Sequence, residues 1–286
     1  MISYKLGVFN LFLLINSFFV FSQSKHPHDD GRKIKIPIVF HIISKNDSEN
    51  IEDSLVLSEL QDLNLDFSKS NDMSLLDPDF AKLVANLNIE FQLLDSVFNK
   101  NDLKGIQRIY SKKKVNRNLL LINPKTCVNV FVARQKNASG ILIDRINLNY
   151  KDVGLNTHLL THETGHWLGL YHIFGQMGSS SWWNITFKDW DDLIEDTPEQ
   201  KGATAICYQI TPDCPCPPKN IFYKGRKRLY NNFMDYNPCR CMFTVGQANK
   251  MRNNIINHKI KLFINSKIQR YEKSLIFIVC FLIYIL

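Results

Sequence analysis

The segment from 160 to 175, LTHETGHWLGLYHIFG, constrains the fold of this chain more than any other stretch. His162 and His166 are four residues apart, so on a helix both imidazoles project from the same face. Two imidazoles placed in this way can reach one zinc ion at the usual Zn–N distance of about 2.0–2.1 Å. Glu163 follows the first histidine and lies where a carboxylate can take a proton from a water molecule on the metal. The segment therefore predicts a helix that carries a zinc site.

Gly169 and His172 extend the pattern. If the helix continued, His172 would lie on the side of the helix opposite His166. A sharp turn at Gly169, in a backbone conformation that other residues resist, would bring His172 back toward the first two histidines. Three imidazoles leave a fourth position open for water, as in catalytic zinc sites. The alternative, ordinary histidines in a core or on a surface, gives no reason for a glycine at this position.

Hydrophobic periodicity predicts an alternation of strands and helices within one domain over residues 34–266. The segments 34–43, 87–94, 126–133 and 140–150 have the composition of strands, and 54–69, 156–170 and 243–263 that of helices. Thr244 and Gln247 form a predicted capping box at the start of the last helix. Residues 176–230 are rich in Gly, Ser, Trp, Pro and Cys and lack periodicity. The order predicts an α/β (α+β) domain divided by a groove, with an irregular C-terminal half.

Both ends of the chain are unusual. Residues 1–22 contain an early lysine, a long apolar run and a short cleavage-like sequence, which predicts a signal peptide and export. Residues 23–33 form a short polar leader. Residues 267–286 combine a charged spacer with an apolar run from Leu275 to Leu286, which would span only about 18 Å as a helix. A membrane tail, a lipid-anchor signal and a buried strand all remain open, so the protein is expected outside the cell, either released or held at the membrane.

The net charge of +8 arises from dispersed basic residues, so we expect no nucleic-acid partner. We also expect a monomer. Five of the seven cysteines lie between 207 and 241. In an exported protein such clustering predicts disulfides. The alternative, a second metal site, would use CxC pairs that lack the two-residue gap of structural zinc sites.

The segment HETGHWLGLYH resembles the metzincin clan of zinc peptidases, and HWLGLYH followed by IFG resembles its pappalysin family. Two downstream segments extend the resemblance: EDTPEQ at 195–200 and NNFMDYNPCRCMFTVGQANKMR at 231–252. Weaker likeness upstream brings its coverage to residues 34–262. The resemblance implies a metzincin-like catalytic domain with a twisted mixed β-sheet, an active-site helix, a long backing helix and a disulfide-stapled C-terminal half.

The resemblance also implies roles for single residues. His162, His166 and His172 would bind zinc, and Glu163 would be the general base. Met234 would form the hydrophobic base under the metal, and the hydroxyl of Tyr236 would stabilise the oxyanion. A structural calcium ion near the DTP segment is the remaining implication, with an acidic solvated loop as the alternative; the candidate ligands are Asp192, Glu195, Asp196 and Thr197.

Departures from the family pattern concern the cysteines. No cysteine follows soon after the third histidine, so one of the two usual disulfides loses its partner. The resemblance then implies a pair Cys207–Cys241, with Cys214 or Cys216 joined to Cys239. Cys239 also stands where members that cleave before arginine or lysine have an aspartate, so that preference does not carry over.

The chain is thus expected to be a secreted zinc endopeptidase acting on protein or peptide substrates. The rival hypothesis is a catalytically silent, zinc-bound peptide-binding module tethered to a membrane.

Overall fold

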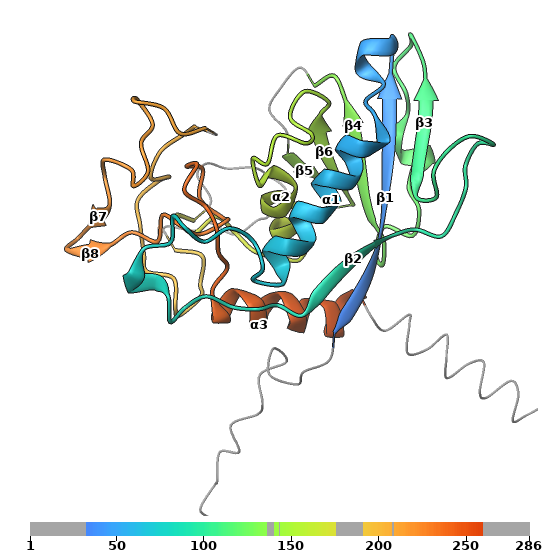
Figure 1. Cartoon of the computed structure of the whole chain (residues 1–286). Helices are drawn as coiled ribbons and strands as arrows, with labels where there is room; N and C mark the ends of the chain where they lie inside the picture. The colour runs from blue at the N-terminus through green and yellow to red at the C-terminus, as the bar shows by residue number, and fades with distance from the viewer. Residues whose placement is uncertain (1–32, 136–139, 143, 176–190, 208, 260–286) are drawn as a thin grey trace, which may run out of the picture.

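The computed structural model describes residues 33–135, 140–142, 144–175, 191–207 and 209–259. These residues form a six-stranded sheet with helices packed on one face, followed by a long irregular region (Figure 1). The predicted signal peptide, most of the leader and the C-terminal tail lie outside the described residues. Among the described residues, no helix is long and apolar enough to cross a membrane.

The sheet is mixed and mostly parallel. Its strand order is β2-β1-β4-β6-β5, and β3 pairs with the second half of β1. The strands are β1 (Ile34–Ser44), β2 (Ile89–Leu93), β3 (Ile106–Tyr110), β4 (Val128–Ala133), β5 (Gly140–Leu142) and β6 (Arg145–Asn149). The central strands β1 and β4 are almost wholly apolar because both faces of the sheet are covered. Only β5, at the edge, runs antiparallel to its neighbour.

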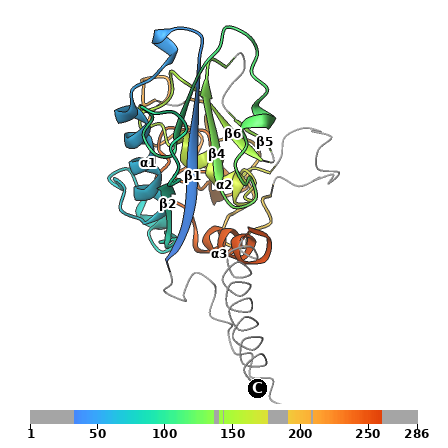
Figure 2. The same ribbon diagram turned by 90° about the vertical axis from the view of Figure 1, so that its right-hand side faces the viewer.

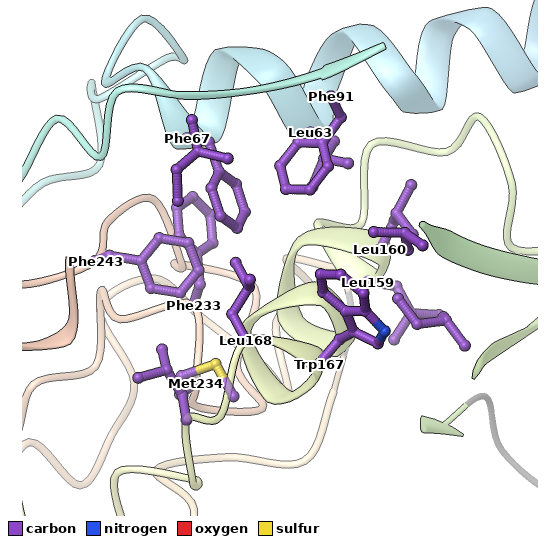
Figure 3. Packing of buried hydrophobic residues seen from close by; sticks show 14 of the residues in the cluster. Leu63, Phe67, Phe91, Leu159, Leu160, Trp167, Leu168, Phe233, Met234 and Phe243 are labelled. Carbon is purple, nitrogen blue, oxygen red and sulfur yellow. The ribbon is translucent and has the colours of Figure 1, made fainter. Parts of the chain in front are cut away.

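Two helices cover the same face of the sheet. α1 (Asp53–Phe67) packs on β2 and on α2 (Leu159–Trp167), and α2 packs on β6 and β5 (Figures 1 and 2). α1 is a helix, as its sequence predicts, and it buries Val56, Leu63 and Phe67 at helical spacing. Leu55 and Leu57, which the apolar spacing also placed on the buried face, are exposed. Figure 3 shows Leu63 and Phe67 of α1 in one core with side chains of β2, of α2 and its C-cap, and of the C-terminal region, namely Phe91, Leu160, Trp167, Leu168, Phe233 and Phe243.

α3 (Val245–Asn254) lies across the end of the sheet at which β1 begins (Figures 1 and 2). The predicted capping box is confirmed: the Thr244 hydroxyl accepts from the Gln247 amide, and the Gln247 side chain accepts from the Thr244 amide. At the other end, Arg252 donates to the carbonyl of Leu87, 3.0 Å away, just before β2. α3 is therefore fixed to the sheet, and a short π-helical segment, Ile255–Lys259, follows it.

The prediction from the sequence was wrong for one part of the sheet and missed another. Residues 140–150, predicted as one strand, form the hairpin of β5 and β6, and β3 was not predicted. In the hairpin, Arg145 donates to the neighbouring carboxylate of Asp144 at the reversal. No Asn-Gly or similar turn signal marks this reversal in the sequence. In β3 the two isoleucines, Ile106 and Ile109, are three residues apart, so β3 lacks the apolar alternation that marks β2.

The irregular region from 191 to 244 contains two disulfides, Cys207–Cys214 and Cys216–Cys239. The second agrees with one of the two alternatives predicted for Cys239. The predicted pair Cys207–Cys241 is wrong, and Cys241 is a buried free thiol, as is Cys127. Two hydrogen bonds between Thr211 and Cys214 close a tight turn that returns Cys214 toward Cys207. Cys241 is held elsewhere, because its carbonyl accepts from the Asn71 side chain at 2.9 Å.

Candidate metal centre

α2 starts from an unusual residue that ties it to α1. His158, at the N-cap, has a left-handed backbone with φ of 53°. Its Nδ1 lies 2.9 Å from the carboxylate of Asp66 on α1, and the Thr161 hydroxyl donates to the same oxygen at 2.5 Å. Asp66 is buried, so these bonds fix the start of α2 against α1. The two helices therefore act as one support for the histidines.

After α2 the chain turns at Gly169, as the sequence predicts. Gly169 has φ of +95°, a left-handed conformation that L side chains resist. Its amide donates to the carbonyl of His166, and the amide of Leu170 donates to that of Gly165. These two bonds form a Schellman motif with Gly169 as its left-handed residue. The turn sends the chain back, so His172 faces the same space as the histidines on α2.

The three histidines meet at their Nε2 atoms. The Nε2 atoms of His162 and His166 are 3.2 Å apart, those of His162 and His172 3.2 Å, and those of His166 and His172 3.0 Å. Three nitrogens bound to one tetrahedral zinc at about 2.05 Å would be about 3.3 Å apart. Among the described residues, this is the only group of three His, Cys, Asp or Glu side chains with the spacing of a metal site. The donor set therefore fits zinc with a fourth position left over.

The remaining ring nitrogens explain why the Nε2 atoms converge. Nδ1 of His162 is 2.7 Å from the carbonyl of Phe233, and Nδ1 of His166 is 2.8 Å from that of Leu170. Because a carbonyl only accepts, both Nδ1 atoms must carry the proton, which leaves the Nε2 lone pairs for a metal. Burial lowers the pKa of all three imidazoles, most strongly for His162 and His172. Neutral imidazole is the form that binds metal.

Glu163 lies on the same helix, between the two histidines, and is 5% exposed. Burial raises the pKa of its carboxyl to about 8, and the charge of Arg240 acts in the opposite direction. A carboxyl with a pKa near neutrality can both accept and return a proton. Its position and chemistry suit a general base.

Met234 and Tyr236 approach the histidines from the C-terminal region. Met234 is fully buried, and its sulfur packs against Gly165 of α2. Figure 3 places it under the helix, beside Leu168. The hydroxyl of Tyr236 lies 2.7 Å from Nε2 of His172, and its ring contacts that of His162 at a centroid distance of 5.4 Å. The structure therefore brings both residues to the predicted site.

The four calcium candidates do not converge in the same way. The Thr197 hydroxyl donates to the buried carboxylate of Asp192, and burial raises the pKa of Asp192 to about 7. The carboxylate of Asp196 instead accepts from the hydroxyl of Thr244, at 2.7 Å, and from the amide of Gly246, at 2.8 Å, at the start of α3. Glu195 is exposed. Asp196 thus has a structural role that the motif did not reveal.

Sequence reasoning also missed Arg240. Its guanidinium is buried and donates to the carbonyls of Thr157, at 2.7 Å, Asp235, at 3.2 Å, and Asn237, at 2.9 Å. It therefore joins the segment around Met234 to the residue before the N-cap of α2. Its position between two cysteines suggested only a departure from the family pattern, and no spacing rule pointed to this contact.

A cavity of about 380 Å³ lies between the start of α2, the end of α1 and the segment after Tyr236. Its polar lining includes Asp66, His158 and Arg240, and its apolar lining includes Leu155 and Ile210, both more than half exposed. Its lining reaches α2 only at the N-cap residue His158 and includes none of the three histidines of the metal centre.

Known proteins share these features. Residues 144–256 match the peptidase family model described as Pregnancy-associated plasma protein-A. An extracellular metalloprotease of Arthroderma benhamiae is 38% identical over 94 residues, which are 32% of this chain and 28% of that protein. An extracellular metalloprotease of Neurospora crassa is 38% identical over 98 residues, which are 33% of this chain and 28% of that protein. The chain thus spans little more than a quarter of these curated relatives.

Solved structures extend the likeness over most of the described fold. Mature mirolysin of Tannerella forsythia, in complex with a cleaved peptide, is 27% identical with a TM-score of 0.60, covering 80% of this chain and 94% of that one. Mirolysin in complex with compound 9 is 28% identical with a TM-score of 0.60, covering 78% and 91%. The family model, the motifs and the fold agree, and residues 144–256 of this chain are similar to the pappalysin family of metzincins.

Proposed function

We propose that this chain is a secreted zinc-dependent endopeptidase. The observation that carries the proposal is that three imidazole Nε2 atoms lie within 3.2 Å of one another. The buried carboxyl of Glu163 follows the first of these histidines directly on α2. A silent binding module would need the metal ligands but not a base at Glu163. The names of the relatives, which are extracellular metalloproteases, support the same choice.

His162, His166 and His172 would hold the zinc, which when bound supplies Lewis acidity to a substrate carbonyl and to a water molecule. Glu163 takes a proton from the attacking water, whose oxygen bonds to the carbonyl carbon. The Tyr236 hydroxyl donates to the oxyanion that forms at the carbonyl oxygen. As the C–N bond breaks, the proton on Glu163 passes to the leaving amine. Met234 contributes packing beneath the site and no chemistry.

The substrate would be a peptide in extended form. β5 is an edge strand beside α2, so its free side offers backbone groups for pairing with a peptide near Gly140 and Asp144. Mirolysin has been solved in complex with a cleaved peptide, which supports a peptide as the class of substrate.

The proposal also covers export, the oligomeric state and a second metal ion. The predicted signal peptide at 1–22 would direct export, and the run from Leu275 to Leu286 would either be cut off or hold the protein at a membrane. The protein would act as a monomer. A structural calcium ion would bind at Asp192, whose second carboxylate oxygen is buried and has no hydrogen-bond partner among the described residues.

Substitution of Glu163 tests the proposal directly. Glu163→Gln should reduce cleavage of casein by at least about 10³-fold while zinc content stays near one per chain. Glu52→Gln, a change at an exposed carboxyl on the same domain, is the control and should cleave normally. Undiminished cleavage by Glu163→Gln would remove Glu163 from the mechanism. Zinc binding without cleavage by the unmodified protein would favour the silent module.

A further inference from the structure

At the end of α2, the backbone hydrogen bonds of the helix and its turn do not use the carbonyl of Leu168. The Schellman bonds use the carbonyls of Gly165 and His166, and the amide of Leu168 uses that of Thr164. The carbonyl of Leu168, at the C-cap, accepts instead from the side chain of Asn254, whose Nδ2 lies 2.8 Å away. Asn254 is the last residue of α3 and lies 86 positions along the chain. A residue outside the zinc motif thus completes the end of the histidine helix.

Gly169 makes room for this contact. A Cβ atom at position 169 would stand only 2.1 Å from Nδ2 of Asn254 and 3.2 Å from its Cγ. The glycine is therefore required twice, once for its φ of +95° and once for the close approach of the Asn254 amide. The second requirement cannot be derived from the spacing of the histidines.

A second side chain of α3 contacts the same turn. Nζ of Lys250 lies 5.5 Å from the centre of the Tyr171 ring, the distance of a cation–π contact. Lys250 and Asn254 are four residues apart, so they lie on one face of α3. α3 itself is fixed by its capping box, by the bonds of Asp196 at its start and by Arg252 at its other end. The turn at 168–171 therefore rests on a part of the molecule that is anchored to the sheet.

Two metal-binding side chains depend on this turn. The carbonyl of Leu170 orients the ring of His166 through Nδ1. The path of the backbone through the turn places His172 beside the two histidines of α2. We propose that Asn254 is a positioning residue for the metal centre: its amide holds the turn at 168–171 in the one arrangement that brings His172 to the other two imidazoles. This proposal rests on the proposed function, because it assumes that the three imidazoles bind a metal.

Cobalt binding tests the proposal without reference to activity. Co²⁺ is titrated into the metal-free full chain, and its visible absorption reports both affinity and ligand geometry. Asn254→Ala removes the donor, and Asn254→Asp keeps its shape but places an acceptor against the carbonyl of Leu168. Both should weaken Co²⁺ binding by about tenfold or more and alter the spectrum at saturation. Asn253→Ala, at the exposed neighbouring asparagine, is the control and should bind as the unmodified protein does.

A double substitution tests the steric half of the proposal. Gly169→Ala should weaken Co²⁺ binding both through backbone strain and through collision with Asn254. Combining Gly169→Ala with Asn254→Ala removes the collision, so the double variant should bind more tightly than the product of the two single losses predicts. Simple multiplication of the two losses would overturn the steric coupling.

The melting temperature of each metal-free variant separates positioning from stability. Weaker binding and an altered saturated spectrum, with a melting temperature close to that of Asn253→Ala, support the proposal. An unchanged saturated spectrum overturns it even where the melting temperature falls, because Asn254 would then only stabilise the fold. If the unmodified protein binds no Co²⁺ or Zn²⁺, the proposed function itself fails. If the unmodified protein binds them and both Asn254 variants bind equally well, only this inference fails.

Discussion

Gly165 and Met234 touch so closely that no side chain fits between them: a Cβ atom at Gly165 would stand 2.6 Å from the sulfur of Met234. Gly165 lies between Glu163 and His166 on α2, and Met234 precedes Tyr236 by two residues. The contact therefore sets the distance between the two segments that carry the proposed chemistry.

Gly165→Ala should destabilise the protein by about 1–3 kcal/mol, because the added methyl group overpacks a fully buried site. The free energy of unfolding in urea measures the loss. Gly140→Ala is the control, since nothing lies within 4 Å of the Cβ it would add. Equal stability of the two variants would show that α2 can move away from Met234 without cost.

Metal removal should lower stability as well as activity, because only the folded chain brings the three imidazoles together. Zinc at 100 times its dissociation constant should raise the free energy of unfolding by about 2.7 kcal/mol over the chelated protein. Calorimetric melting with and without zinc measures the difference. A melting temperature that zinc does not change would contradict a preformed three-histidine site.

Tyr236→Phe should lower kcat by about 10²-fold with little change in KM, since the hydroxyl would act on the oxyanion and not on the bound substrate. The ring contacts of Tyr236 with His162 and His172 would persist in phenylalanine. Peptide hydrolysis kinetics separate kcat from KM, and zinc content checks that the metal centre is intact. A rise in KM alone would assign Tyr236 to substrate binding.

The stability of the fold should fall as pH rises, because of Glu59 on α1. Burial raises the pKa of Glu59 to about 7 in the folded chain, although the amide of Gly154 donates to its carboxylate at 2.8 Å. The unfolded chain has the ordinary value of 4.5, so the folded chain binds more protons between the two pKa values. The cost of ionising Glu59 is absent below about pH 4.5 and complete above about pH 7.

Glu59→Gln should therefore remove a decline in unfolding free energy of roughly 3 kcal/mol between pH 5 and pH 8. Urea unfolding at several pH values measures the slope. The control is Asp213→Asn, at an exposed carboxyl, which should keep the slope of the unmodified protein. If both variants keep the slope, other buried carboxyls cause it.

Peptide mapping without reduction should recover Cys207 joined to Cys214 and Cys216 joined to Cys239. Cys127 and Cys241 should react with a thiol reagent only after denaturation, because both are buried, and burial raises the pKa of each thiol to about 12. A peptide that contains Cys207 joined to Cys241 would restore the pairing that the family pattern implies.

The sequence was most informative where function depends on local spacing. The spacing of His162, His166 and His172, together with the glycine at 169, predicted a turn after the helix, and the structure has this turn at Gly169. The prediction was possible because helix geometry fixes the direction of each side chain from its position in the sequence. The capping box of α3 was predictable for the same reason. Apolar periodicity likewise located α1 and the central strands β1 and β4.

Contacts between distant segments could not be predicted. The hydrogen bonds of Arg240 with Thr157 and of Asn254 with Leu168 join residues more than 80 positions apart, and neither pair has a local signature. The predicted pair Cys207–Cys241 was wrong for a related reason, because five clustered cysteines allow several pairings and only the path of the chain selects one. Asp196 lies in an acidic segment that suggested a cation site. In the structure its carboxylate instead accepts from the amide of Gly246 in the first turn of α3, which is a capping role.

The two halves of the chain are interwoven by backbone pairing. The amide of Ala85 donates to the carbonyl of Phe243 at 3.0 Å, and the amide of Val245 donates to that of Leu83 at 3.1 Å. The segment that matches the family model, residues 144–256, includes Phe243 and Val245 but not their partners. Expressed alone, that segment would expose these backbone groups and the apolar surface beneath them. A fragment that keeps these backbone groups paired must therefore begin upstream of Leu83, well before the segment that matches the family model.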